Sequence, residues 1–143
     1  MSTNPHTSRA QTSVSAQCVN AAKKGRLDLL QLARKNGCPW DEYTCAWAAA
    51  NGHRDVLQWA RENGCPWNTD TCAYAAANGN LDMLQWAREN GCEWNADTCY
   101  AAAGTGRLAV LQWARENGCP WDARTHRWAR HDVRQWVDAN WKK

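Results

Sequence analysis

The sequence predicts an all-α fold, a solenoid of stacked helix pairs, and three observations lead to this prediction. The stretch Trp40–Pro66 returns as Trp67–Glu93 with 19 of 27 residues identical, and again as Trp94–Pro120. Each copy contains two short runs of helix-forming residues separated by Asn-Gly or a similar breaker. The link between copies is too short for a sizeable β-hairpin. A period of 27 residues is typical of stacked repeat architectures.

Two fainter copies flank the three clear ones and set the expected domain organisation. Residues 1–12 are polar, rich in Ser and Thr, and have no apolar period, so we predict a disordered tail. We expect residues 13–143 to form one repeat domain. Its units are 13–39 (N-terminal cap), 40–66, 67–93, 94–120 and 121–143 (C-terminal cap).

Two helices can be placed within each unit. We number the repeat positions 1 to 27, with Trp40, Trp67, Trp94 and Trp121 at position 1. The first helix follows an N-cap that we expect at position 4 or 5, where Asp or Thr occurs, and ends at the Asn-Gly of positions 12 and 13. The second helix covers positions 15 to 24 and ends at the Gly of position 25. Its positions 15, 17, 18, 20 and 21 share one apolar face.

Tryptophan is unusually frequent and recurs at fixed positions. The chain has 11 Trp and no Phe, and most Trp residues stand at positions 1 and 20. We therefore predict that tryptophan fills much of the core, with the position 1 ring plugging the groove between successive helix pairs.

All eight cysteines are also repeat positions. Four stand at position 6 and four at position 26, so we interpret them as small buried residues with free thiols rather than as a disulfide framework. A cysteine at position 26 precedes the next one at position 6 by seven residues, but close C-x₂₋₄-C pairs typical of zinc sites are missing. We predict no metal and no cofactor.

Composition excludes several function classes. The net charge is +3, which is too small to indicate a nucleic-acid-binding protein. Potential catalytic side chains recur in every unit and so belong to the scaffold, and we predict that the chain is not an enzyme. No segment resembles a signal peptide or a bilayer span, and free thiols suit a reducing compartment, so we expect a cytoplasmic protein that does not bind membranes.

Motifs across the repeats carry a family resemblance. The segment Thr44–His53, with its Ala-Ala-Ala-Asn-Gly-His sequence, and the Leu-rich helix that follows it resemble an ankyrin repeat. The units are shorter than usual, and the missing residues fall where ankyrin repeats form a β-hairpin. The Trp- and Cys-rich form is similar to the ankyrin arrays of giant DNA viruses of amoebae. This resemblance implies a monomeric, non-catalytic scaffold that binds another protein. The expected partner is a protein of the host cell, and the expected location is the host cytoplasm.

Positions that differ between near-identical copies are the candidates for recognition. Variation concentrates at positions 2 to 4, 7, 8, 11, 14 and 15. By its resemblance to ankyrin arrays, the side formed by the starts of the first helices is the concave, partner-binding one. The predicted partner-binding residues are Glu42, Tyr43, Thr69, Asp70, Asp97, Tyr100, Arg124 and Arg127.

The last unit departs from the repeat and leaves alternatives open. It lacks the Gly-containing turn, which predicts a single continuous or kinked capping helix with Trp128, Ala129, Val133 and Trp136 facing inward. On one helix, an arginine stripe from Arg124 to Arg134 would form a basic surface. The alternatives to protein binding are therefore polyanion or nucleic-acid binding through this cap, and a structural spacer or fragment of a longer array. We consider nucleic acid the less favoured partner.

Overall fold

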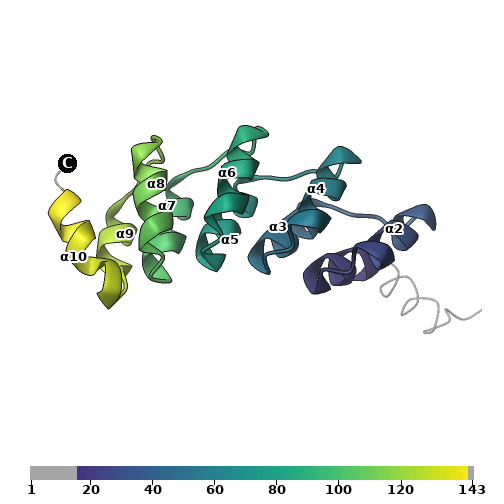
Figure 1. Cartoon of the computed structure of the whole chain (residues 1–143), viewed down its shortest axis with the longest axis horizontal. Helices are drawn as coiled ribbons and strands as arrows, with labels where there is room; N and C mark the ends of the chain where they lie inside the picture. The colour runs from purple at the N-terminus through teal and green to yellow at the C-terminus, as the bar shows by residue number, and fades with distance from the viewer. Residues whose placement is uncertain (1–15, 142–143) are drawn as a thin grey trace, which may run out of the picture.

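The computed structural model describes residues 16–141, and all regular elements of this part of the chain are α-helices (Figure 1). This confirms the predicted all-α solenoid, while the predicted tail of residues 1–12 lies outside the described residues. A helix over residues 16–24 pairs with the next one along the chain. The following helices are α2 (Leu27–Lys35), α3 (Glu42–Ala50), α4 (Arg54–Glu62), α5 (Thr69–Asn78), α6 (Leu81–Glu89), α7 (Ala96–Gly104), α8 (Leu108–Glu116), α9 (Ala123–Trp128) and α10 (His131–Asn140).

The pairs stack side by side along one axis, with the two ends of the array far apart (Figure 1). We call α3, α5, α7 and α9 the A helices and α2, α4, α6, α8 and α10 the B helices. Neighbouring A helices pack directly on one another, whereas α4, α6, α8 and α10 each pack mainly on the A helix of their own unit. None of the described helices is long and apolar enough to cross a membrane.

The A helices begin earlier than the sequence predicted. Their N-caps are the Asp and Asn residues of position 2, whose side chains accept a hydrogen bond from the backbone N–H two residues later, as in Asn68 to Asp70 at 3.0 Å. The prediction that positions 4 and 5 cap these helices is therefore wrong. Asp70 lies in the first turn, and Thr71 at position 5 is fully buried.

Helices α3, α5 and α7 each end shortly before a glycine in the left-handed conformation. Gly79, at position 13, has φ +78°, and a Cβ there would lie 2.8 Å from the Arg107 side chain. That side chain lies across the end of α5, where its Nε donates to the carbonyl oxygen of Ala77 at 3.2 Å. Glycine at position 13 therefore satisfies both the backbone conformation and the close approach of the next unit.

The core consists of small and aliphatic side chains. In the unit around α6, Met83, Leu84 and Ala87 are fully buried, while Leu81 and Trp86 at positions 15 and 20 are partly buried. The predicted apolar face is thus correct, but only its positions 17, 18 and 21 are fully buried. Alanine and cysteine on the A helices fill the rest of the core, which lets neighbouring helices approach closely.

The tryptophans lie at the rim of the core, which corrects the prediction that they fill it. Trp67 is partly buried, and its ring packs edge-on against Trp86 of the same unit with centroids 5.8 Å apart. The guanidinium of Arg61 lies over the Trp67 ring at 4.3 Å and donates to the carbonyl oxygen of Cys65 at 2.6 Å. The same arrangement recurs at Arg34, Arg88 and Arg115. These stacks join each unit to the next.

The eight cysteines are buried thiols, and none is in a disulfide. The structure brings together positions 6 and 26 of the same unit, 20 residues apart, rather than the seven-residue pairs considered from the sequence. For example, the Cys72 thiol approaches the carbonyl oxygen of Cys92 at 3.9 Å, and the Cys92 thiol donates to that of Asn68 at 3.4 Å. The thiols therefore contact the backbone of their own unit.

We predict that these thiols do not react with a thiol reagent in the folded protein. Burial, together with the hydrogen bond to Cys38, raises the pKa of Cys18 to about 12, so at pH 8 it is neutral as well as inaccessible. Titration with a chromogenic disulfide should find eight thiols only after unfolding. Because this folded-state pKa exceeds the unfolded value, Cys18 contributes stability that should be lost as pH rises above about 8.5. Rapid reaction of two or more thiols in the native state would contradict the prediction.

The last unit contains two helices, which corrects the prediction of one capping helix. Helix α9 ends at Trp128, and the backbone at Ala129 and Arg130 is extended, with ψ values of 132° and 156°. Ala129 and Val133 face inward as expected and Trp136 is partly buried, but the Trp128 side chain is 58% exposed.

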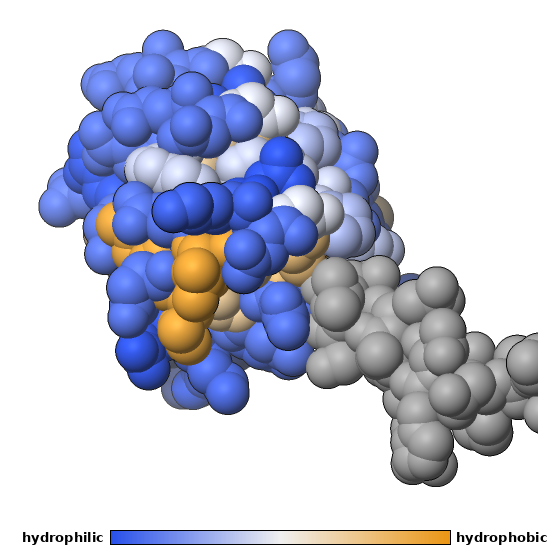
Figure 2. Space-filling model, turned by 90° about the vertical axis from the view of Figure 1, so that its right-hand side faces the viewer, coloured by the Kyte–Doolittle hydropathy of each residue, from blue (hydrophilic) through white to orange (hydrophobic). Residues whose placement is uncertain are grey.

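The opposite end keeps apolar side chains at its surface. Leu29 at position 17 is 41% exposed, although Val56 and Met83 at the same position are fully buried. Figure 2 shows an apolar patch on this end of the array, surrounded by hydrophilic residues. The exposure follows from the absence of a preceding helix pair among the described residues.

Candidate functional site

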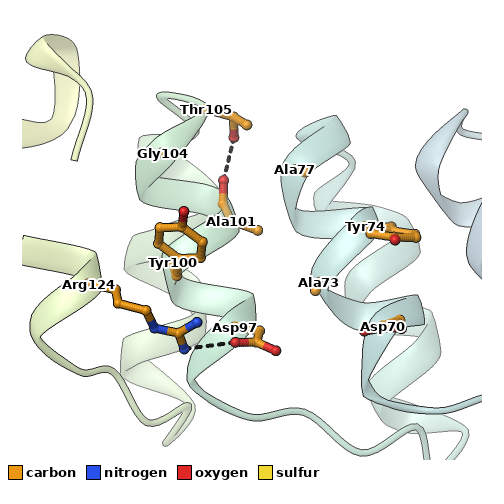
Figure 3. Close-up of a pocket in the computed structure, with 10 residues that line it drawn as sticks. All are labelled: Asp70, Ala73, Tyr74, Ala77, Asp97, Tyr100, Ala101, Gly104, Thr105 and Arg124. Atoms are coloured by element: carbon orange, nitrogen blue, oxygen red, sulfur yellow. Dashed lines mark hydrogen bonds and ion pairs between the residues drawn. The ribbon is translucent and has the colours of Figure 1, made fainter. Parts of the chain in front are cut away.

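A groove of about 480 Å³ lies between α5 and α7, and Figure 3 shows the residues that line it. We call it the α5–α7 groove. Its floor is largely alanine, its acidic end is formed by the first turns of the two helices, and two tyrosines take part in its lining. The lining residues are Asp70, Ala73, Tyr74, Ala77, Asp97, Tyr100, Ala101, Gly104, Thr105 and Arg124.

Helical periodicity explains why these side chains share one surface. On an A helix, positions 4, 7, 8 and 11 lie on one side, because residues three and four apart are neighbours. Positions 5, 6, 9 and 10 lie on the other side, and in α5 they are Thr71, Cys72, Ala75 and Ala76, all of which are fully buried. The groove is therefore built mainly from positions that vary between the repeats, while the invariant positions hold the core.

Four of the eight predicted partner-binding residues meet in the groove: Asp70, Asp97, Tyr100 and Arg124. The other four lie outside it. Glu42 and Tyr43 are exposed in the first turn of α3, and Thr69 begins α5. Arg127 lies near the end of α9, with its guanidinium 5.5 Å from the centre of the Trp128 ring.

Several groove residues were missing from the predicted set. Ala73, Tyr74, Ala77, Ala101, Gly104 and Thr105 line the groove as well. The sequence does contain a signal for the groove at position 8. This position is aromatic in two successive units, at Trp47 and Tyr74, but alanine in the next unit, at Ala101. The small side chain of Ala101 leaves open the space that an aromatic ring would occupy. The ring of Tyr74 instead packs towards Trp47, with centroids 6.2 Å apart.

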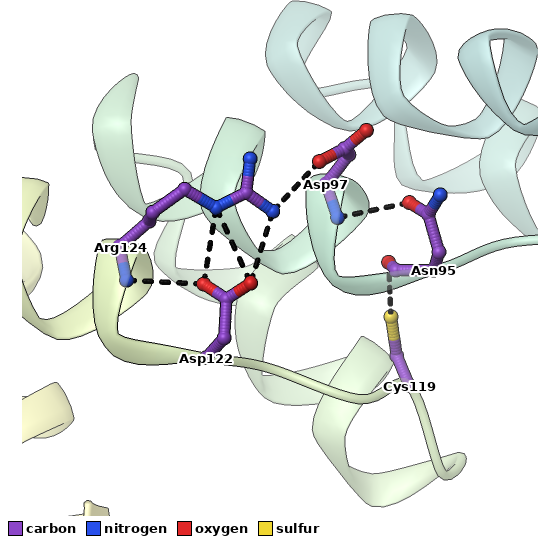
Figure 4. A network of polar contacts seen from close by, with 5 residues as sticks. All are labelled: Asn95, Asp97, Cys119, Asp122 and Arg124. Atoms are coloured by element: carbon purple, nitrogen blue, oxygen red, sulfur yellow. Dashed lines mark hydrogen bonds and ion pairs between the residues drawn. The ribbon is translucent and has the colours of Figure 1, made fainter.

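Arg124 closes one end of the groove through a network of ion pairs (Figure 4). Its guanidinium contacts Asp97 at 2.7 Å and Asp122 at 3.0 Å, and it lies 4.9 Å from the centre of the Tyr100 ring. Asp122 also caps α9 by accepting from the backbone N–H of Arg124. The hydrogen bond from Arg124 lowers the pKa of Asp122, so the carboxylate stays ionised.

Asp70 occupies the same repeat position one unit earlier, yet its carboxylate has no ion-pair partner among the described residues. The reason is visible in the sequence. Position 4 of the next unit carries Arg124 in the case of Asp97, and the two side chains form an ion pair. In the case of Asp70, position 4 of the next unit carries Asp97, which has the same charge. The groove thus has one paired and one unpaired carboxylate.

The arginines of the last unit do not form the single stripe that the sequence predicted, because they lie on two helices. Arg124 is held by two aspartates, and Arg130 approaches Asp132 at 3.7 Å. Arg134 donates to the carbonyl oxygens of His126, Arg127 and Ala129 at the end of α9. Much of the positive charge of this unit is therefore committed to intramolecular contacts.

The lining of the groove is chemically mixed. It combines an apolar floor, two tyrosines and carboxylates. The Thr105 hydroxyl donates a hydrogen bond to the carbonyl oxygen of Ala101 at 2.6 Å. Within residues 16–141, no group of three or more His, Cys, Asp or Glu side chains lies close enough to hold a metal ion.

The fold and groove together define the class of protein as an all-α repeat protein with a surface groove between two units. Comparison with models of known protein families and with curated proteins gave no match.

Proposed function

We propose that the chain is a non-catalytic scaffold that binds another protein through the A helices, with the α5–α7 groove at the centre of the contact. The observation that carries this proposal is the agreement between variation and geometry. Repeats that are nearly identical differ at positions 4, 7 and 8, and these positions line the groove. Recognition of a partner requires such differences on a common frame, whereas stacking requires the constant positions.

The nature of the surface supports a protein partner. A groove with an apolar floor, tyrosines and a few charged groups matches the composition that protein interfaces favour at their centres. The ankyrin resemblance and its association with viral arrays and host-cell partners accord with this proposal. The A helices correspond to the partner-binding side in that family.

Filling the groove should abolish partner binding. Ala101→Trp introduces the residue that position 8 already carries at Trp47, so the helix has a precedent for this side chain. The matched control is Ala109→Trp on the exposed side of α8. Immobilised native protein and the Ala109→Trp variant should retain the same proteins from a lysate of amoebal cells in quantitative mass spectrometry, and the Ala101→Trp variant should lose them.

Retention of an unchanged set of proteins by the Ala101→Trp variant would contradict the proposal. Far-UV circular dichroism of the three proteins serves as the folding control, because all have the same helical scaffold. A loss of binding by both tryptophan variants would place the contact elsewhere.

A further inference from the structure

We propose that the α5–α7 groove binds an arginine side chain of the partner protein, with the guanidinium beside Asp70 and the hydrocarbon stem on the alanine floor. This inference rests on the proposed function and adds the chemistry of the partner. It commits to an arginine-containing segment of a protein, and it excludes nucleic acids and anionic membranes as ligands of this groove.

The charge of the surface is the first argument. Helices α3, α5 and α7 contain Glu42, Asp70 and Asp97 but no lysine or arginine, although the whole chain has a net charge of +3. The N-cap of α3 adds Asp41 on the same side of the array. Arg124 is the cation that lines the groove, and it is paired. A cationic partner is favoured electrostatically, and polyanions are repelled.

The chain itself contains an example of the proposed ion pair. Arg124 reaches from the next unit to the carboxylate of Asp97 (Figure 4), and its guanidinium lies over the Tyr100 ring (Figure 3). Planar guanidinium groups combine ion pairing with stacking on aromatic rings, which lysine does less well. One repeat earlier, Asp70 has the same place on its helix and lacks such a partner among the described residues. A guanidinium from another molecule can supply the missing contact.

The floor of the groove suits the remainder of an arginine side chain. Ala73 and Ala77 on α5 face Ala101 on α7 across the groove, and the carboxylates of Asp70 and Asp97 lie at one end of it (Figure 3). Arginine buries its methylene groups along apolar surface while its charged end remains near polar groups. The alanine floor and the acidic end of the groove therefore match the two parts of one arginine side chain.

The test uses a random heptapeptide library displayed on phage and selected on the immobilised full chain. We expect the selected peptides to be enriched in arginine. The best peptide, fluorescently labelled, is then titrated by anisotropy against the native protein, Asp70→Asn and Asp82→Asn. Asp82 is the matched control because it is an exposed carboxylate in the first turn of α6, so both variants remove one helix N-terminal charge.

Asp70→Asn should weaken binding about tenfold, as expected for loss of a charge-assisted hydrogen bond, while Asp82→Asn should change it less than twofold. Replacing the peptide arginine with citrulline should have an effect similar to Asp70→Asn, and replacing it with lysine a smaller one. Affinity should fall as salt concentration rises.

Equal affinities of the two asparagine variants, an arginine-free selection or no selection at all would overturn the inference. The Ala101→Trp variant separates this failure from that of the proposed function. If Ala101→Trp abolishes peptide binding and Asp70→Asn does not, the groove is a binding site for a partner without the arginine contact. If Ala101→Trp has no effect on peptide binding, the groove itself is not the site and the proposed function falls with the inference.

Discussion

Replacing Leu84 by alanine should lower the free energy of unfolding by about 2–5 kcal/mol. Leu84 is fully buried in α6, in the middle of the array, where units on both sides contribute to its surroundings. Removal of its side chain leaves a cavity that the close-packed alanine and cysteine neighbours cannot fill. Urea denaturation followed by far-UV circular dichroism measures this loss.

Leu29→Ala is the matched control for this experiment, because it removes the same atoms from a side chain that is 41% exposed at the end of the array. Its expected cost is about 1 kcal/mol or less. Equal losses for Leu84→Ala and Leu29→Ala would contradict this expectation and would show that the Leu29 side chain is covered in solution.

Arg134→Gln should destabilise the last unit by about 1–3 kcal/mol. The Arg134 guanidinium bonds the carbonyl oxygens of His126 and Arg127 at 2.9 and 3.1 Å, so it satisfies groups that the end of α9 leaves open. Glutamine is too short to reach all of them. Because a terminal repeat contacts only one neighbour, the effect should appear as local opening of α9 and α10.

Hydrogen–deuterium exchange of the amides in α9 and α10 measures this opening directly. Arg127→Gln provides the control, since Arg127 is exposed and its guanidinium contacts the exposed Trp128 ring. We expect faster exchange for Arg134→Gln and an unchanged pattern for Arg127→Gln. Faster exchange of both variants to the same extent would indicate that charge, rather than the carbonyl contacts, stabilises this unit.

The repeat period made most of the architecture predictable. Equal spacing of glycine, cysteine and leucine over several copies requires one structural unit to recur, and the periodicity within a copy separates core positions from exposed ones. Variation at positions 4, 7 and 8 also pointed to four residues that line the groove, namely Asp70, Asp97, Tyr100 and Arg124.

Other features depended on local choices that the sequence leaves open. Positions 2, 4 and 5 all carry residues that can cap a helix. The structure shows that position 2 is the N-cap, because the backbone of Asn68 is extended there, with φ −146° and ψ −168°. The large size of the tryptophans favours a place in the core. Their position at the rim follows from stacking between arginine and a second tryptophan, which requires partial exposure to keep the guanidinium near water.

The sequence by itself determined the 27-residue unit, its two helices, and which side of each helix faces the core, because these depend on spacing along one chain. Tertiary structure alone decided how far apart neighbouring helices lie and which residues of different units meet. The hollow beside Ala101, the ion pair between Arg124 and Asp97, and the contact of Arg134 with the end of α9 are of this kind. They depend on the packing between units, since a distance across a groove is set by the side chains that hold the two helices apart.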